Sequence, residues 1–102
     1  MKAKIDFSVF SSEVKAFGNI VGEIELSVLA GVGDYLTFDD GQLMQISPKF
    51  FSGSLAVESR RFEVGGKGCS LMLQDIIVDG EDEAEALMAG FERAYGFKGY
   101  RY

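Results

Sequence analysis

The stretch GGKGCS, from Gly65 to Ser70, comes nearest to a phosphate-binding loop. In such loops backbone N–H groups of glycines cradle the anion, and a Lys and a hydroxyl complete the site. A P-loop has four residues between its first Gly and its Gly-Lys-Ser/Thr end, and a helix follows it. Here the spacing is shorter and a strand-like apolar segment follows, so the pattern favours the turn of a β-hairpin.

Cys69 is the single cysteine and therefore the one candidate thiol nucleophile. The charge of Lys67, two residues earlier, would lower the pKa of a thiolate beside it. The chain has no His to act as a general base, and a strand position favours a packed thiol. The lack of His also excludes Ser-His-Asp and Cys-His sites and His-based zinc sites. We therefore predict no catalytic residue, no cofactor and no metal centre.

Acidic residues are concentrated just before and at the start of a helix predicted over residues 80–95: Asp75, Asp79, Glu81, Asp82 and Glu83. Carboxylate oxygens are the ligands that Ca²⁺ and Mg²⁺ prefer. These acids lack the register of an EF-hand loop and its central Gly, whereas helix capping and a solvated helix face explain them directly. Carboxylate chemistry of the glycosidase type stays open, because the spacing selects no pair.

Cations and aromatic rings concentrate in one region, which holds four of the ten Lys and Arg residues: Lys49, Arg60, Arg61 and Lys67, with Phe50, Phe51 and Phe62 between them. On a small barrel such a mixture can stack bases and hold phosphates. Strand alternation nevertheless puts Arg60 and Arg61 on opposite faces, so ordinary charges on an edge strand are the simpler interpretation.

The C-terminal segment FKGYRY is short, aromatic and basic. Tyr and Arg are enriched at the energetic centres of protein interfaces, although a frayed chain end is the simpler expectation. The candidate interface residues are therefore Arg60, Arg61, Phe50, Phe51, Tyr100, Arg101 and Tyr102.

The segment Asp79–Gly96 is the clearest helix, predicted over residues 80–95. Apolar residues recur at helical spacing along one face: Ala84, Leu87, Met88, Phe91, Ala94 and Tyr95. Asp79 is the expected N-cap and Gly96 the expected left-handed stop, with Arg93 in the last turn. Such an apolar stripe needs a sheet to lie on, and we expect Leu87, Met88 and Phe91 to bury against the strand at 69–78.

Strand patterns fill the rest of the chain, at about residues 2–10, 19–29, 34–38, 42–47, 55–64 and 69–78. The Asp39-Asp40-Gly41 turn predicts that Tyr35–Phe38 and Gln42–Ile46 pair as a hairpin, and Ser11–Phe17 is expected to be a loop. Gly22 in mid-strand predicts a bulge or bend. A change of phase along 55–64 predicts a bulge near Ser59–Arg61.

Residues 1–102 are therefore expected to form a single α+β domain. Its architecture is a five- or six-stranded, strongly bent antiparallel sheet or a small β-barrel, with one C-terminal helix packed on it. An open sheet with the helix across one face is the alternative.

The composition limits the function classes. The chain has 102 residues, 47 % of them apolar, and a formal net charge of -6, which argues against a general affinity for nucleic acid or anionic lipid. No run approaches the roughly 20 apolar residues of a membrane span, and the N-terminal residues alternate where a signal peptide would be continuously apolar. With one cysteine, this predicts a cytoplasmic protein without a membrane partner.

We therefore expect a small acidic, non-enzymatic binding protein that acts through protein–protein contacts, as an adaptor, an inhibitor or a homo-oligomer. In the inhibitor version, four acids would imitate phosphates: Glu23, Glu25, Asp39 and Asp40. One alternative is a nucleic-acid-binding barrel that uses Lys49, Arg60, Arg61 and the nearby Phe residues. The other is a small-molecule-binding protein or a carboxylate-based enzyme.

Overall fold

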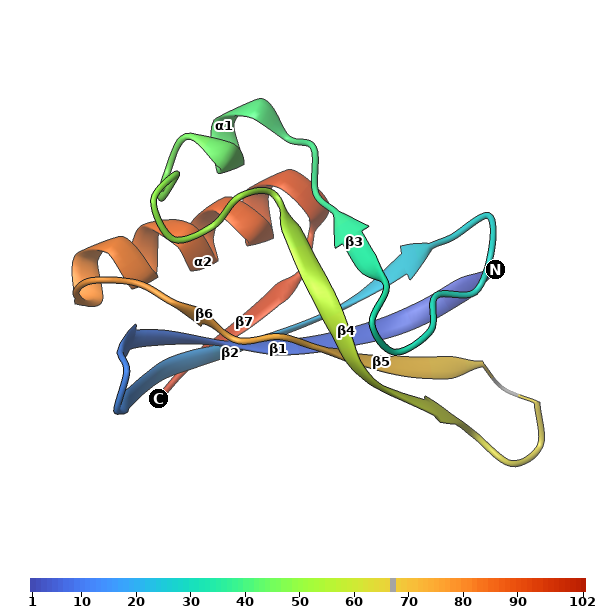
Figure 1. The fold of residues 1–102 in the computed structure, drawn as a ribbon. Helices are drawn as coiled ribbons and strands as arrows, with labels where there is room; N and C mark the ends of the chain where they lie inside the picture. The colour runs from blue at the N-terminus through green and yellow to red at the C-terminus, as the bar shows by residue number, and fades with distance from the viewer. Residues whose placement is uncertain (67) are drawn as a thin grey trace.

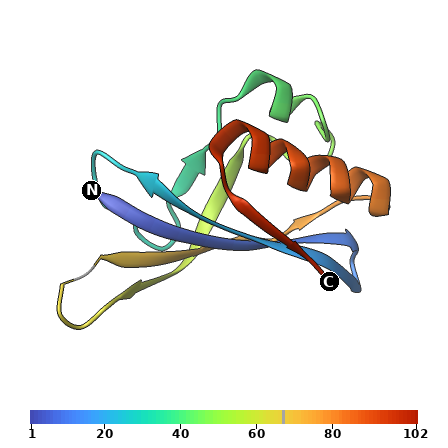
Figure 2. The ribbon, with the colours of Figure 1, turned by 180° about the vertical axis from the view of Figure 1, so that it is seen from behind.

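The computed structural model describes residues 1–66 and 68–102, and these residues form a twisted sheet with both helices on one of its faces (Figure 1). The view from behind shows both helices on the same side of the sheet again, with no helix on its other side (Figure 2). Within the described residues the elements in chain order are β1 (Lys2–Ser12), β2 (Lys15–Glu25), β3 (Tyr35–Thr37), α1 (Gly41–Met44), β4 (Ser54–Phe62), β5 (Cys69–Leu73), β6 (Ile76–Ile77), α2 (Glu81–Tyr95) and β7 (Lys98–Arg101).

The strand order is β3-β4-β5-β1-β2-β7, with β6 beside β1. The hairpins β1–β2 and β4–β5 are antiparallel, as are β2–β7 and β3–β4, so the α+β class and a mostly antiparallel sheet are confirmed. The centre departs from the prediction, because β1 runs parallel to β5 and to β6. Among the described residues β3 and β7 stand at the two ends of the order and do not pair with each other, so the sheet has seven strands instead of the predicted five or six, it is open, and the barrel is not supported.

The predicted strand at 42–47 is wrong, because Gly41–Met44 form the short helix α1. The Asp40 carboxylate accepts the Leu43 N–H at 2.9 Å and so caps the helix. Leu43 and Ile46, three residues apart, have the spacing of one helical face, and both lie against Gly90 of α2. The predicted hairpin across the turn is therefore absent from the described chain, and β3 pairs instead with β4.

The predicted loop at Ser11–Phe17 is also wrong, because β1 and β2 continue to a two-residue turn at Glu13 and Val14. The strand predicted at 69–78 is divided into β5 and β6. At the division the Gln74 carboxamide accepts the Ala56 N–H at 2.7 Å, and the Asp75 carboxylate accepts the Ser8 N–H at 3.3 Å. Side chains there replace the partners that a continuous ladder would have supplied.

Of the two bulges predicted within strands, the structure has one and lacks the other. The pairing of β4 with β5 shifts between Val57 and Ser59, next to the predicted bulge. Gly22, in contrast, pairs with Ile5 in regular register, so it is not a bulge. A side chain at Gly22 would overlap the ring of Phe97, and the glycine is therefore required for close packing rather than for bending.

Helix α2 confirms its predicted length and its buried face. Ala84, Leu87, Met88 and Phe91 are fully buried, and Gly96 ends the helix with a left-handed φ of 70°. The N-cap is Gly80 rather than Asp79, without a side-chain cap. The expected packing on 69–78 is wrong, since α2 lies over β1, β2 and β7.

Phe91 lies at the centre of an aromatic cluster. Its ring centroid is 5.0 Å from that of Phe7, 5.3 Å from Phe51, 5.5 Å from Phe38 and 6.3 Å from Phe97. These rings come from β1, from α2 and from the segments that follow β3, α1 and α2, so one side chain connects distant parts of the chain. Edge-to-face and offset contacts of this kind add to the free energy gained by burying each ring.

Replacing Phe91 by Ala should lower the free energy of unfolding by about 3–5 kcal/mol, because the cavity cannot close around four neighbouring rings. Urea denaturation followed by circular dichroism measures this change. Phe62→Ala is the matched control, since that ring is exposed and its removal should change the unfolding free energy by less than about 0.5 kcal/mol. Equal effects of the two substitutions would contradict the central role of Phe91.

Candidate interaction surface

The sheet has one face covered by α2 and one uncovered face. On β1 the residues Ala3, Ile5, Phe7 and Val9 are buried beneath the helix side, and the residues between them point the other way. The register carries this alternation across the sheet. The uncovered face therefore presents Lys4 and Asp6 of β1, Val21 and Glu23 of β2, Ser59 and Arg61 of β4, Ser70 and Met72 of β5, and Lys98 and Tyr100 of β7.

An open groove of about 640 Å³ crosses this uncovered face. Its apolar part is formed by Val21 and Met72, and the Met72 side chain is 48 % exposed. Polar and charged side chains lie between and around these two residues: Asp6 of β1 lies between Met72 and Val21 in the register, Ser59 and Ser70 lie on one side, and cations lie at both ends. The groove thus combines exposed apolar area with charged and polar side chains, a mixture that protein-binding surfaces commonly have.

Some charged side chains along the groove have an ionic or hydrogen-bonding partner, and others have none. Lys4 lies 3.8 Å from Glu63, Glu23 lies 3.6 Å from Lys2, and Asp6 accepts a hydrogen bond from Asn19. Arg61 and Lys98 lie at opposite ends of the groove, and neither forms an ion pair with a described residue. In a chain of net charge -6, the groove therefore presents two cations that are free to bind an anionic group.

The structure brings only part of the predicted interface to this face. Arg61 lines the groove, and Tyr100 and Tyr102 follow Lys98 at two-residue intervals on the same side. Arg60 lies on the other side, as alternation predicts, where its guanidinium is 5.1 Å from the centroid of the Phe62 ring.

Phe50 and Phe51, both predicted to belong to an interface, lie in different surroundings. Phe51 is buried in the aromatic cluster, so its place in an interface is wrong. Phe50 is partly exposed near Lys49, whose ammonium is 5.4 Å from the ring centroid. That pair precedes β4, while Arg60 and Arg61 lie near its end, and the predicted cluster of cations and rings does not assemble.

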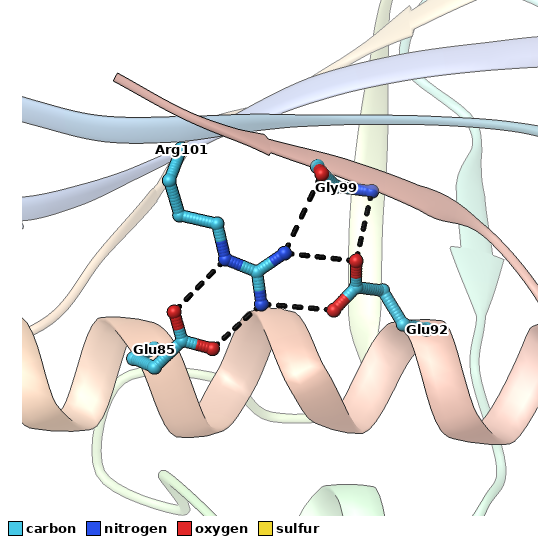
Figure 3. A network of polar contacts seen from close by, with 4 residues as sticks. All are labelled: Glu85, Glu92, Gly99 and Arg101. Carbon is cyan, nitrogen blue, oxygen red and sulfur yellow. Dashed lines mark hydrogen bonds and ion pairs between the residues drawn. The ribbon is translucent and has the colours of Figure 1, made fainter.

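Arg101 has a structural partner that the sequence did not reveal (Figure 3). Its guanidinium donates to both carboxylate oxygens of Glu85, at 2.9 and 2.6 Å, and to both of Glu92, at 2.8 Å each. The expected frayed end is wrong, because residues 98–101 form β7 and Arg101 ties that strand to α2. Glu85 and Glu92 lie two helical turns apart on one face, which is the one pattern that could have indicated a shared cation.

These hydrogen bonds alter the ionisation of the three groups. Donation from Arg101 lowers the pKa values of Glu85 and Glu92 below the ordinary value of 4.5, and the two carboxylates raise the pKa of Arg101. The stabilisation is therefore complete above pH 4.5 and is lost as the pH falls through the lowered carboxyl pKa values.

The remaining sequence candidates have structural roles. The predicted hairpin turn between β4 and β5 is confirmed, since the Glu63 N–H donates to the Gly68 carbonyl and the Gly66 N–H to the Glu63 carbonyl, and Lys67 lies outside the described residues. Cys69 is buried, as expected for a packed thiol. Glu81 pairs with Lys15 at 3.2 Å, and Glu83 accepts the Asp79 N–H. Within residues 1–66 and 68–102, His, Cys, Asp and Glu form no group of three that could hold a metal ion.

Comparisons with protein-family models, with curated proteins and with solved structures found no match for this chain. In the part of the chain that the structure describes, neither helix has the length and apolar character needed to span a bilayer.

Replacing Arg101 by Met should lower the free energy of unfolding at pH 7 by about 1 kcal/mol, because partly exposed ion pairs contribute modestly. The difference from the unchanged protein should disappear as the pH falls below 4.5, where both carboxylates become protonated. Urea titrations between pH 7 and pH 2 measure it. Lys49→Met removes a cation that has no carboxylate partner among the described residues and should give a small, pH-independent change. A constant difference for Arg101→Met would contradict the ion-pair account.

Proposed function

We propose that the protein is a non-enzymatic binding module that recognises a partner protein on its uncovered sheet face. The observation that carries this proposal is the groove of about 640 Å³, which joins exposed Met72 and half-buried Val21 to the uncompensated charges of Arg61 and Lys98. Apolar area beside charged groups supports protein recognition, since the apolar contacts contribute affinity and the charges contribute orientation.

The chemistry of the groove selects the class of partner. Two free cations at its ends favour acidic side chains, and the apolar side chains of Met72 and Val21 favour an aliphatic or aromatic side chain between them. Tyr100 and Tyr102 extend the same face beyond Lys98 and add the amphipathic area that interfaces use. The expected partner segment is therefore acidic at two points with an apolar residue between them.

The alternatives have less support. A nucleic-acid site built from Lys49, Arg60 and Arg61 would need these cations on one surface, and they lie on separate surfaces. A small molecule could occupy a volume of this size, but such sites usually bury most of the ligand, and this groove lies open on a sheet. The two carboxylates that line it, Asp6 and Glu23, already have partners in Asn19 and Lys2.

Photo-crosslinking tests the proposal in the native host. A benzophenone amino acid in place of Met72 should form a discrete adduct with one polypeptide, because Met72 lines the groove and is exposed. The same amino acid in place of Val14 is the matched control, since that residue is exposed in the β1–β2 turn, away from the groove.

Reversing the two free cations, with Arg61→Glu and Lys98→Glu, should reduce the adduct from position 72 about tenfold, which corresponds to about 1.4 kcal/mol. Lys49→Glu should leave it unchanged. Mass spectrometry identifies the crosslinked segment, which should carry acidic residues beside the attached one. Equal adducts from positions 72 and 14, or an adduct insensitive to the charge reversal, would refute the proposed surface.

A further inference from the structure

A second recess lies between strands β2 and β3, at the place where the sheet fails to close. We call it the β2–β3 slot and define it by its lining residues, Glu23–Leu26, Leu36–Phe38, Tyr95 and Phe97, which enclose about 320 Å³. Both views of the ribbon place β3 beside the end of β2 (Figure 1, Figure 2). Three consecutive residues at the end of β2 and Leu26, which follows them, line the slot, and so it is the edge of this strand, not one of its faces, that borders the recess.

The backbone of β2 presents unused hydrogen-bonding groups to the slot. The Leu26 N–H donates to the Met1 carbonyl at 2.7 Å, so the even residues of β2 bond to β1. On the other edge the Tyr102 N–H donates to the Phe17 carbonyl, so the odd residues point away from β1. Within the described chain β7 pairs with β2 only as far as Val21, and the N–H and C=O groups of Glu23 and Glu25 therefore face the slot.

Strand β3, on the other side of the β2–β3 slot, also presents backbone groups that bond to no neighbouring strand in the described chain. The Phe38 N–H donates to the Gly53 carbonyl and the Val57 N–H donates to the Asp34 carbonyl, so the even residues of β3 bond to β4. The odd residue Thr37 consequently points its backbone groups away from β4, and it lines the slot. A bare strand edge on each side of an apolar floor is the geometry that accepts an added strand.

We propose that the β2–β3 slot binds an extended segment of another protein as an added β-strand, in which apolar and basic side chains alternate. Side chains on the inner side of that strand would lie beside Ile24 and Leu26, over the ring of Phe97. Those on the outer side would lie beside the carboxylates of Glu23 and Glu25, which are 54 % and 69 % exposed. Opposite charges across neighbouring strands stabilise such a pair, and the alternation follows from the period of two.

Both glutamates can accept a second cation. The present partners are the Lys2 ammonium, 3.6 Å from Glu23, and the Met1 amino group, 3.2 Å from Glu25. Lys2 and Met1 lie on the β1 side of these carboxylates, since β1 pairs with the other edge of β2. The side toward the slot is free for a Lys or Arg of the added strand.

A second copy of this chain fits the edge poorly. Two β2 edges paired antiparallel about Ile24 would place Glu23 of one copy opposite Glu25 of the other on the same face. Like charges directly opposite one another destabilise a strand pair, and outward charges are a common protection against self-association at sheet edges. The charges of this edge therefore favour a basic strand over a copy of itself.

Three capped hexapeptides test the proposal. Lys-Val-Lys-Val-Lys-Val has the required alternation, Glu-Val-Glu-Val-Glu-Val reverses the charge, and Lys-Lys-Lys-Val-Val-Val keeps the composition without the alternation. Amide hydrogen exchange by NMR reports binding residue by residue. With the first peptide at saturation, exchange at the Glu23 and Glu25 amides should slow at least tenfold, and calorimetry should show at least tenfold weaker binding of the other two.

The double variant Glu23→Lys and Glu25→Lys should reverse the preference, so that the acidic peptide binds and the basic one does not. The matched control is Glu13→Lys with Glu58→Lys, which makes the same charge change at exposed positions outside the slot and should keep the original preference. If the double variant does not fold, the exchange pattern of the unchanged protein still decides. Arg61→Glu should not affect this binding, because Arg61 lies on β4, three strands away from β2 in the order of the sheet, so the two proposals can fail separately.

Equal binding of the alternating and the block peptides would overturn the proposal, since charge alone would then explain the affinity. Slowed exchange confined to residues outside 22–26 would overturn it as well. If the Glu23 and Glu25 amides were protected without peptide, increasingly so with protein concentration, the occupant would be a second copy and the proposed basic strand would be wrong.

Discussion

The position of α2 depends on the burial of Phe91 among four other aromatic rings, and the rest of the structure follows from that position. In the core, the Phe91 ring packs against Phe7 and so fixes the helix over β1. It also packs against Phe38 and Phe51, which fix the segments after β3 and α1. From the edge, Arg101 ties β7 to the outer surface of the same helix. With α2 fixed on one face of the sheet, the other face has no cover within the described chain, and it is this face that carries the groove.

The parts of the fold that follow local patterns could be predicted from the sequence. Alternation along β1 and the apolar stripe of α2 identified their buried faces residue by residue, because a period of 2 or 3.6 directly reflects burial on one side. The 42–47 segment was assigned wrongly, because the Asp39-Asp40-Gly41 step suggests a hairpin turn, whereas Asp40 is the N-cap of a helix too short to show a period. Parallel pairing of β1 with β5 was also beyond prediction, because strand order depends on long-range contacts that leave no local periodicity.

The candidate site was less predictable than the fold for the same reason. Clustering along the chain drew attention to Phe50, Phe51, Arg60 and Arg61, yet these residues end up in the core, in a loop and on two faces of β4. The groove instead joins Lys98, Met72 and Arg61, which are separated by up to 37 positions and meet only through the register of β4, β5, β1, β2 and β7. The sequence did predict that Arg60 and Arg61 lie on opposite faces of β4, because the alternation of side chains along a strand is a local property.

The uncovered face and the bare edge of β2 have a common cause in the turn between α2 and β7. Phe97 must reach the aromatic cluster, and Gly22 gives its ring the space on β2 that it needs. The chain can therefore join the sheet only after Phe97, so β7 begins at Lys98 opposite Val21. That starting point places the Lys98 side chain in the groove, and within the described chain it leaves Glu23, Ile24 and Glu25 without a paired strand on the edge of β2 away from β1. The aromatic contact that completes the core thus also keeps the sheet open, and both proposed binding surfaces depend on it.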